Sequence, residues 1–183
     1  MHTFRLVVVF AAIVMAAAST ANAQQADVLA PARHGELQCY APNVQAKTCE
    51  ALESFTFDPQ GKITNVGEAA IYPSPLVIMN LSTAVEVRSD GAVCGPLLQQ
   101  DIDHMTFTVD GQAPSDEQMQ SMRTQFGQQA ASLIGVDTCT TFTPAADGAL
   151  NANATIGGVP RPDMTTTVLW VRPGDGYHVA AGG

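Results

Sequence analysis

Residues 105–135 read MTFTVDGQAPSDEQMQSMRTQFGQQAASLIG, and this segment contains the two kinds of element that decide the expected fold. Residues 105–109 alternate apolar and polar side chains, which is typical of a half-buried strand, and Asp110-Gly111 predicts a turn after it. Ser115 is followed three positions later by Gln118, which is the spacing of a capping box at a helix N-terminus. The segment therefore predicts a strand, a turn and a helix in that order.

The helix is expected to run from about residue 115 to residue 134. Its apolar residues recur at intervals of three and four and are Met119, Met122, Phe126, Ala130, Leu133 and Ile134. This spacing places them on one face of a helix, and Gly135 suits the C-terminal end. A methionine-rich face can bind partner peptides, but it more often fills irregular gaps in a core. We therefore expect one long amphipathic helix packed against the rest of the fold.

Most other patterned segments indicate short strands. They lie at residues 55–57, 76–79, 85–87, 150–156 and 168–171, and they are separated by turn sequences such as Asp147-Gly148. Many short strands with one long helix predict an α+β fold, in which a mainly antiparallel sheet carries the helix on one face. The alternative is an all-β sandwich with an attached helix.

The N-terminus has the features of an export signal. Arg5 precedes an unbroken apolar run from Leu6 to Ala18, and Ala21-Asn22-Ala23 matches a signal-peptidase site. The run is shorter than the roughly 20 residues that span a bilayer, so no membrane span is expected after cleavage. We predict a signal peptide over residues 1–23, a flexible arm over 24–35 and a single disulfide-stapled globular domain over 36–181.

All four cysteines lie in the exported part of the chain, at Cys39, Cys49, Cys94 and Cys139. An even number in an oxidising compartment predicts two disulfides, for which three pairings exist. We favour Cys39 with Cys49, because the turn-rich segment between them can bring its ends together, which leaves Cys94 for Cys139. The spacing matches neither a C-x-x-C redox pair nor a zinc ribbon.

Composition and motifs exclude several function classes. Eight Lys and Arg against 17 Asp and Glu give a net charge of −9, which argues against a nucleic-acid partner. The sequence lacks the nucleophile elbow, the H-E-x-x-H zinc motif, the P-loop and the dinucleotide fingerprint. It predicts no cofactor and no metal, and it favours a protein that is not an enzyme.

The candidate catalytic residues are Asp101, Asp103 and His104. In an extended segment the two aspartates point to the same side, where they could chelate a cation, or Asp103 could orient His104 as a base. The alternative interpretation is an exposed turn with solvated acids before the next strand.

Two groups of residues are candidates for binding. Trp170, Arg172, Tyr177 and His178 combine aromatic, guanidinium and imidazole groups that could form a ligand cleft, although Trp170 also suits the core. Arg161 lies between two prolines in the loop 157–163, which could present it to a partner's pocket or could simply be a stiff connector.

Several short combinations occur together along the chain. They are Cys39-Tyr40-x-Pro42 with Lys47-Thr48-Cys49, Val93-Cys94-Gly95, and Trp170-Val171-Arg172-Pro173 followed by Asp175-Gly176-Tyr177. Together they resemble uncharacterised exported proteins of Gram-negative bacteria over most of the mature chain. The resemblance implies a periplasmic or secreted setting and no particular activity.

We therefore expect an exported, soluble, non-enzymatic domain that binds a protein or a small molecule in the cell envelope. The first alternative is a small hydrolase or metal-dependent enzyme that uses Asp101, Asp103 and His104. The second is an inhibitor-like protein that presents Arg161.

Overall fold

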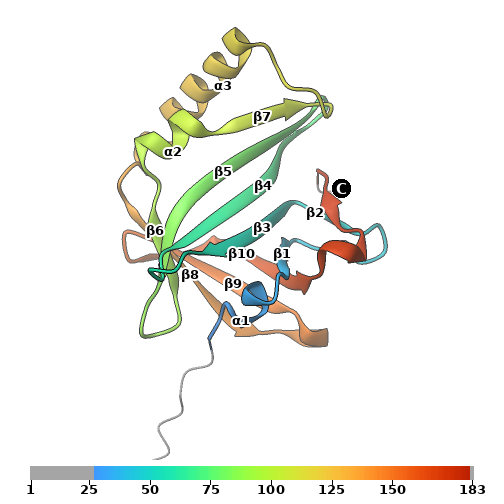
Figure 1. Ribbon diagram of the computed structural model, residues 1–183, viewed down its shortest axis with the longest axis vertical. Coiled ribbons are helices and arrows are strands. Elements are labelled where there is room, and N and C mark those ends of the chain that lie inside the picture. Colours follow the sequence, from blue (N-terminus) through green and yellow to red (C-terminus); the bar gives the residue numbers. More distant parts are fainter. Residues whose placement is uncertain (1–26, 182–183) are drawn as a thin grey trace, which may run out of the picture.

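Eight antiparallel strands close into a barrel in the computed structural model, which describes residues 27–181 (Figure 1). Their order around the barrel is β4-β3-β1-β10-β9-β8-β6-β5, and β5 pairs with β4 to close the ring. The strands are β1 (Leu37–Tyr40), β3 (Ala51–Phe57), β4 (Ile63–Pro73), β5 (Leu76–Val87), β6 (Val93–Pro96), β8 (Asp137–Pro144), β9 (Leu150–Ile156) and β10 (Val159–Val171). The expected export signal, residues 1–23, lies outside the described residues.

The closed barrel shows that the predicted α+β sheet with a helix on one face is wrong. The contact that decides this is between β1 and β10, where Leu37 lies opposite Val171 and Tyr40 lies opposite Val168. Alternation of apolar and polar residues shows which side chains share a face of a strand. It does not show whether distant strands pair, so an open sheet, a sandwich and a barrel give the same local pattern.

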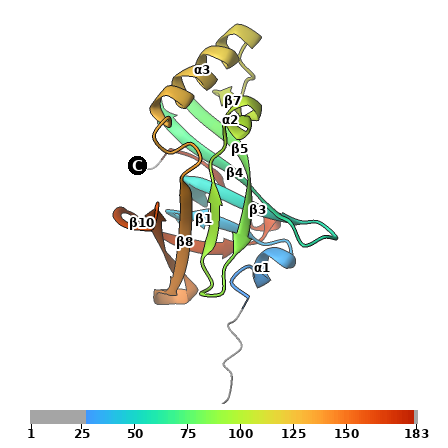
Figure 2. The ribbon, with the colours of Figure 1, turned by 90° about the vertical axis from the view of Figure 1, so that its left-hand side faces the viewer.

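One end of the barrel is covered by the short helix α1 (Ala30–Arg33), which Figure 2 shows beneath the strands. Leu29 is fully buried and Ala32 is nearly so. Both belong to a core cluster with Phe55 and Ile63, and Trp170 packs against that cluster. Of the arm predicted at residues 24–35, the structure describes residues 27–35, and within these Leu29 and Ala32 pack into this end of the barrel.

The opposite end carries the other two α-helices (Figures 1 and 2). Beyond the barrel, β7 (Thr106–Val109) pairs with the upper half of β5, and α2 (Gln99–His104) precedes it. The helix α3 (Asp116–Gln129) follows, and it packs on a core cluster of this extension. The contacts join Met119, Met122 and Phe126 of α3 to Val77, Met105 and Phe107.

The predicted long amphipathic helix is therefore wrong in length and in burial. Regular α-helix ends at Gln129 and none of its residues is buried; beyond it, Leu133 lies in a turn and Ile134 forms an isolated bridge with Leu97. Five glutamines and several other polar residues interrupt the apolar spacing, so only a narrow stripe contacts the sheet. The N-terminal cap is as predicted, because Ser115 Oγ accepts from the backbone N–H of Gln118 at 3.3 Å.

The outer wall of the barrel is covered near the C-terminus by a small parallel pair, β2 (Thr48–Cys49) and β11 (His178–Val179). Beneath this pair, Cys39, Cys49 and Val171 form a buried cluster. The disulfides join Cys39 to Cys49 and Cys94 to Cys139, which confirms the favoured pairing. The remaining elements are 3₁₀ turns at Ala146–Gly148 and Pro173–Asp175. Across residues 27–181, no helix is both long enough and apolar enough to traverse a bilayer.

Candidate ligand-binding site

The interior of the barrel contains a cavity of about 440 Å³. Alternate residues of each strand point inward, and the register of the strands brings inward residues together around the ring. Gln38 of β1, for example, lies between Glu53 of β3 and Trp170 of β10. This volume falls within the range of about 300–1,000 Å³ that is usual for small-molecule sites.

Most of the cavity wall is apolar. The apolar lining residues are Phe55, Leu81, Val85, Val93, Pro96, Leu97, Leu133, Phe142, Ala152, Ala154, Ile156 and Met164. Phe55 also belongs to the core cluster under α1, so this cluster forms the floor of the cavity. Leu97 and Leu133 come from the segments that flank α2 and α3, so they lie toward the other end. An apolar ligand would be covered from both ends.

Four polar side chains from three neighbouring strands converge on one side of the cavity. Tyr40 Oη donates to Gln38 Oε1 at 3.1 Å, and Asn65 Nδ2 donates to Glu53 Oε2 at 2.9 Å. The carboxyl group of Glu53 also lies beside the hydroxyl of Tyr40, and each group acts on the pKa of the other. The four side chains form a polar row along the wall, in the order Asn65, Glu53, Tyr40 and Gln38.

Among these four polar side chains, the amide nitrogen of Gln38 is the buried group that lacks a hydrogen-bond partner. Gln38 is fully buried, and its Nε2 is buried without a hydrogen bond. A buried amide donor without a partner costs about 1–3 kcal/mol, so native proteins rarely retain one without a reason. Because Gln38 lines the cavity, a ligand bound there is in a position to supply the missing acceptor.

Burial shifts the pKa of both titratable groups in the cavity. Removal of Glu53 from water raises its pKa, and the polar contacts with Asn65 and Tyr40 only partly oppose this effect. The pKa of Tyr40 is raised well above its ordinary value, first by burial and then by the nearby Glu53. Among the described residues that line the cavity, none is Lys, Arg or His, so no cation offsets a charge on Glu53.

The cavity reaches the surface beside Met164 of β10. Met164 lines the cavity and is also 46% exposed, so it lies between the interior and solvent. Around it, the β9–β10 register shifts between Arg161, opposite Ala154, and Thr166, opposite Ala152. Residues 162–165 therefore pair with neither β9 nor β1 within the described sheet. This irregular stretch forms the mouth of the cavity.

The structure places the candidate catalytic residues on a helix rather than in an extended segment. Asp101 accepts from the backbone N–H of Leu98 at 2.9 Å and so caps α2. Asp103 accepts from Gln99 Nε2 at 2.9 Å, and His104 Nδ1 lies 2.7 Å from the carbonyl oxygen of Gln100. Asp101 and His104 line a shallow surface hollow that does not include Asp103. Each of the three side chains is thus engaged within its own helix.

The binding candidates near the C-terminus do not form one cleft. Trp170 packs in the cluster under α1, whereas Tyr177 packs on the outer cluster around Cys39. Arg172 is exposed and lies 3.8 Å from Glu36, and His178 is exposed in β11. None of these four residues lines the barrel cavity.

Arg161 is not at the tip of a loop. It lies within β10, and the loop predicted at 157–163 contributes only the turn at Gly157-Gly158. Its guanidinium group forms two hydrogen bonds with Asp163, at 2.9 and 2.6 Å. This pairing raises the pKa of Arg161 and lowers that of Asp163, and it holds the side chain against its own strand.

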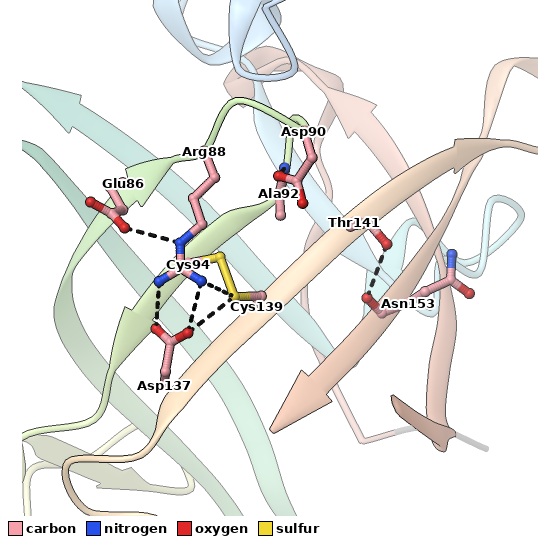
Figure 3. The surroundings of a disulfide bond; sticks show 9 residues. All are labelled: Glu86, Arg88, Asp90, Ala92, Cys94, Asp137, Cys139, Thr141 and Asn153. Carbon is pink, nitrogen blue, oxygen red and sulfur yellow. Dashed lines mark hydrogen bonds and ion pairs between the residues drawn. A yellow bond between two sulfur atoms is a disulfide. The ribbon is translucent and has the colours of Figure 1, made fainter. Parts of the chain in front are cut away.

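Cys94, Asp137 and Cys139 bring three potential metal-ligating atoms together, but the two sulfurs are joined in a disulfide (Figure 3). A disulfide sulfur carries no thiolate charge for a metal ion. Figure 3 also shows that Asp137 faces Arg88, and the two form an ion pair at 2.9 Å. The disulfide links β8 to β6, and the ion pair links β8 to Arg88 at the end of β5.

Sequence reasoning missed the four polar residues of the cavity, although a signal for them exists. Glu53 shares a strand face with Phe55 and Phe57, and Asn65 shares one with Ile63. A carboxyl or amide side chain that shares a strand face with buried apolar residues is expected to point inward.

Comparisons with known proteins add no family to these observations. No protein-family model matches the chain, and no curated protein and no solved structure matches it significantly.

Proposed function

We propose that this chain is an exported, non-enzymatic binding protein that holds a small, mainly apolar molecule inside its barrel. The observation that carries the proposal is the cavity of about 440 Å³, whose wall is mostly apolar and whose polar groups converge on one side. This combination is characteristic of small-molecule sites, in which apolar surface supplies affinity and a few polar groups fix orientation. An interior packed with side chains would leave no such space.

The export part of the proposal rests on other features. The N-terminal segment has the charge, the apolar run and the Ala21-Asn22-Ala23 site of a cleaved signal, and both disulfides suit an oxidising compartment. We expect the mature protein to begin at Gln24 in the periplasm or outside the cell. Intact-mass measurement of the exported protein tests this, and a mass that includes residues 1–23 would contradict it.

Binding can be tested with N-phenyl-1-naphthylamine, an uncharged dye whose fluorescence rises in apolar surroundings. The mature, disulfide-bonded protein should give a saturable increase at one site per chain. The variant Ala154→Trp tests where the dye binds, because Ala154 lines the cavity and an indole there fills much of it. The increase should fall severalfold in this variant.

A matched control separates the cavity from the outer surface. Asn153 is the neighbour of Ala154 on β9 and points to the opposite side of the strand, so Asn153→Trp adds the same ring outside the barrel. This control should bind the dye as the wild type does. Equal binding by the wild type and Ala154→Trp, or no saturable binding by the wild type, would refute the proposal.

A further inference from the structure

We infer that the ligand of the barrel is uncharged and carries a hydrogen-bond acceptor, such as a ketone or amide oxygen, that binds Nε2 of Gln38. This inference rests on the proposed function and specifies the chemistry of the same site. Three observations of the cavity wall support it, and each limits the ligand in a different way.

The first observation is the free donor. Gln38 is fully buried, and its Nε2 lacks a partner while its Oε1 is occupied by Tyr40 at 3.1 Å. The free position of this side chain is therefore a donor, and it lines the cavity. A ligand acceptor placed there satisfies a buried polar group that the protein itself leaves unsatisfied. A ligand that offers only donors would leave the amide unsatisfied.

The second observation is the absence of positive charge. No Lys, Arg or His occurs among the described residues that line the cavity, and the one acidic lining residue is Glu53. A ligand carboxylate would have to leave water without a counter-ion and would lie in the same cavity as Glu53. Carboxylates are therefore disfavoured, although their oxygens are acceptors.

The third observation concerns amines. Glu53 is the one acidic residue that lines the cavity, and burial there raises its pKa, which favours its neutral form. A cationic ligand would have to leave water itself and would also require an ionised Glu53 away from water, and this desolvation cost offsets the attraction between the two charges. The cavity wall therefore suits an uncharged ligand.

Four naphthalene compounds of nearly equal size distinguish these classes by displacement of N-phenyl-1-naphthylamine. They are 2-acetylnaphthalene, which has an acceptor, 2-ethylnaphthalene, which has none, 2-naphthoate and 2-naphthylmethylammonium. The ketone should bind about tenfold more tightly than the ethyl compound, which corresponds to about 1.4 kcal/mol, close to the usual value of one hydrogen bond. Both charged compounds should bind more weakly than the ethyl compound.

The role of Gln38 is tested with Gln38→Met, which keeps the shape of the side chain and removes the amide. The tenfold preference for the ketone should disappear, while 2-ethylnaphthalene should bind at least as tightly as before. Gln129→Met is the matched control, because it makes the same change at an exposed position of α3 outside the cavity. That variant should retain the preference.

The outcomes separate this inference from the proposed function. Binding of 2-ethylnaphthalene without any preference for the ketone would overturn the inference and leave the apolar site intact. Tighter binding of the ammonium or carboxylate compound would also overturn the inference. If the wild type binds none of the four compounds, the proposed function fails first. A preference that survives in Gln38→Met would show that another residue donates to the ketone, and it would overturn the inference.

Discussion

Cys94 and Cys139 lie directly opposite each other on β6 and β8, with their Cα atoms 4.1 Å apart. β6 is a short strand, and it pairs with β5 through only two residue pairs, Glu86 with Cys94 and Val87 with Val93. The disulfide therefore ties this weakly paired strand to its other neighbour, β8, on the opposite side from the short β5–β6 pairing.

Removal of this disulfide should cost more stability than removal of the other. The chain-entropy model gives about 4 kcal/mol for Cys94–Cys139, which spans 45 residues, and about 3 kcal/mol for Cys39–Cys49, which spans 10. The double variants Cys94→Ala/Cys139→Ala and Cys39→Ala/Cys49→Ala can be compared by urea denaturation. A larger loss for the second variant would show that the outer cluster around Cys39 matters more than the closure of the barrel.

Replacement of Glu53 should change how stability depends on pH. The pKa of Glu53 is raised in the fold, so its contribution to stability is fully present below about pH 4.5, the unshifted value, and is lost as the pH rises through the folded value. Glu53→Gln should therefore match the wild type at low pH and exceed it at neutral pH. Thermal melts across the pH range measure the difference, and one pKa unit corresponds to about 1.4 kcal/mol.

The groups that face Glu53 define the control for this experiment. They are Tyr40 and Gln38 on β1, Asn65 on β4 and Thr83 on β5, none of which is charged in the arrangement described. Glu68→Gln is the matched control, because Glu68 is exposed on β4. A pH dependence altered equally by both variants would reflect net charge rather than the cavity.

Truncation of Leu29 should destabilise the floor of the barrel. Leu29 is fully buried in the cluster with Phe55 and Ile63, and a Leu→Ala change in such a site costs about 2–5 kcal/mol. Val44→Ala removes apolar atoms from a side chain that is 61% exposed, and it should change stability by less than about 0.5 kcal/mol. Equal melting temperatures for Leu29→Ala and the wild type would show that α1 contributes little to the core.

Loss of the cap at Ser115 should loosen α3 locally. Ser115 Oγ accepts from the backbone N–H of Gln118, and Gln118 Oε1 accepts from the backbone N–H of Ser115 at 3.0 Å. Ser115→Ala removes one of these bonds at a cost of about 1 kcal/mol, which should appear as faster hydrogen exchange in the first turn. Ser121→Ala makes the same change in the middle of α3 and should leave exchange there unchanged or slower.

The sequence predicts individual strands of this protein better than their assembly. The alternation at residues 105–109 and 150–156 corresponds to β7 and β9, because half-buried strands place apolar residues on one face. Closure depends on pairs such as Tyr40 with Val168, which no local pattern specifies. The helix was predicted too long because apolar spacing continues through Leu133, although this residue lines the barrel from a turn.

The candidate site was missed for a related reason. Asp101, Asp103 and His104 attract notice because they are adjacent in sequence, and that same adjacency places them on one short helix with local hydrogen bonds. Gln38, Glu53 and Asn65 are far apart in sequence and meet only through the register of β1, β3 and β4. A site assembled by strand register becomes visible only when the pairing is known.

The pairing of β1 with β10 has a consequence for the order in which the chain can fold. β1 lies near the start of the described chain, and its partner residues in β10 end at Val171. During synthesis β1 is made before β10, and it must remain without this partner until residues 168–171 have also been made. Contacts of such high sequence separation form slowly, because a long loop must close before they contribute. β10, the last strand of the barrel to be synthesised, is thus the one that completes it, and the barrel cannot close before β10 has been made.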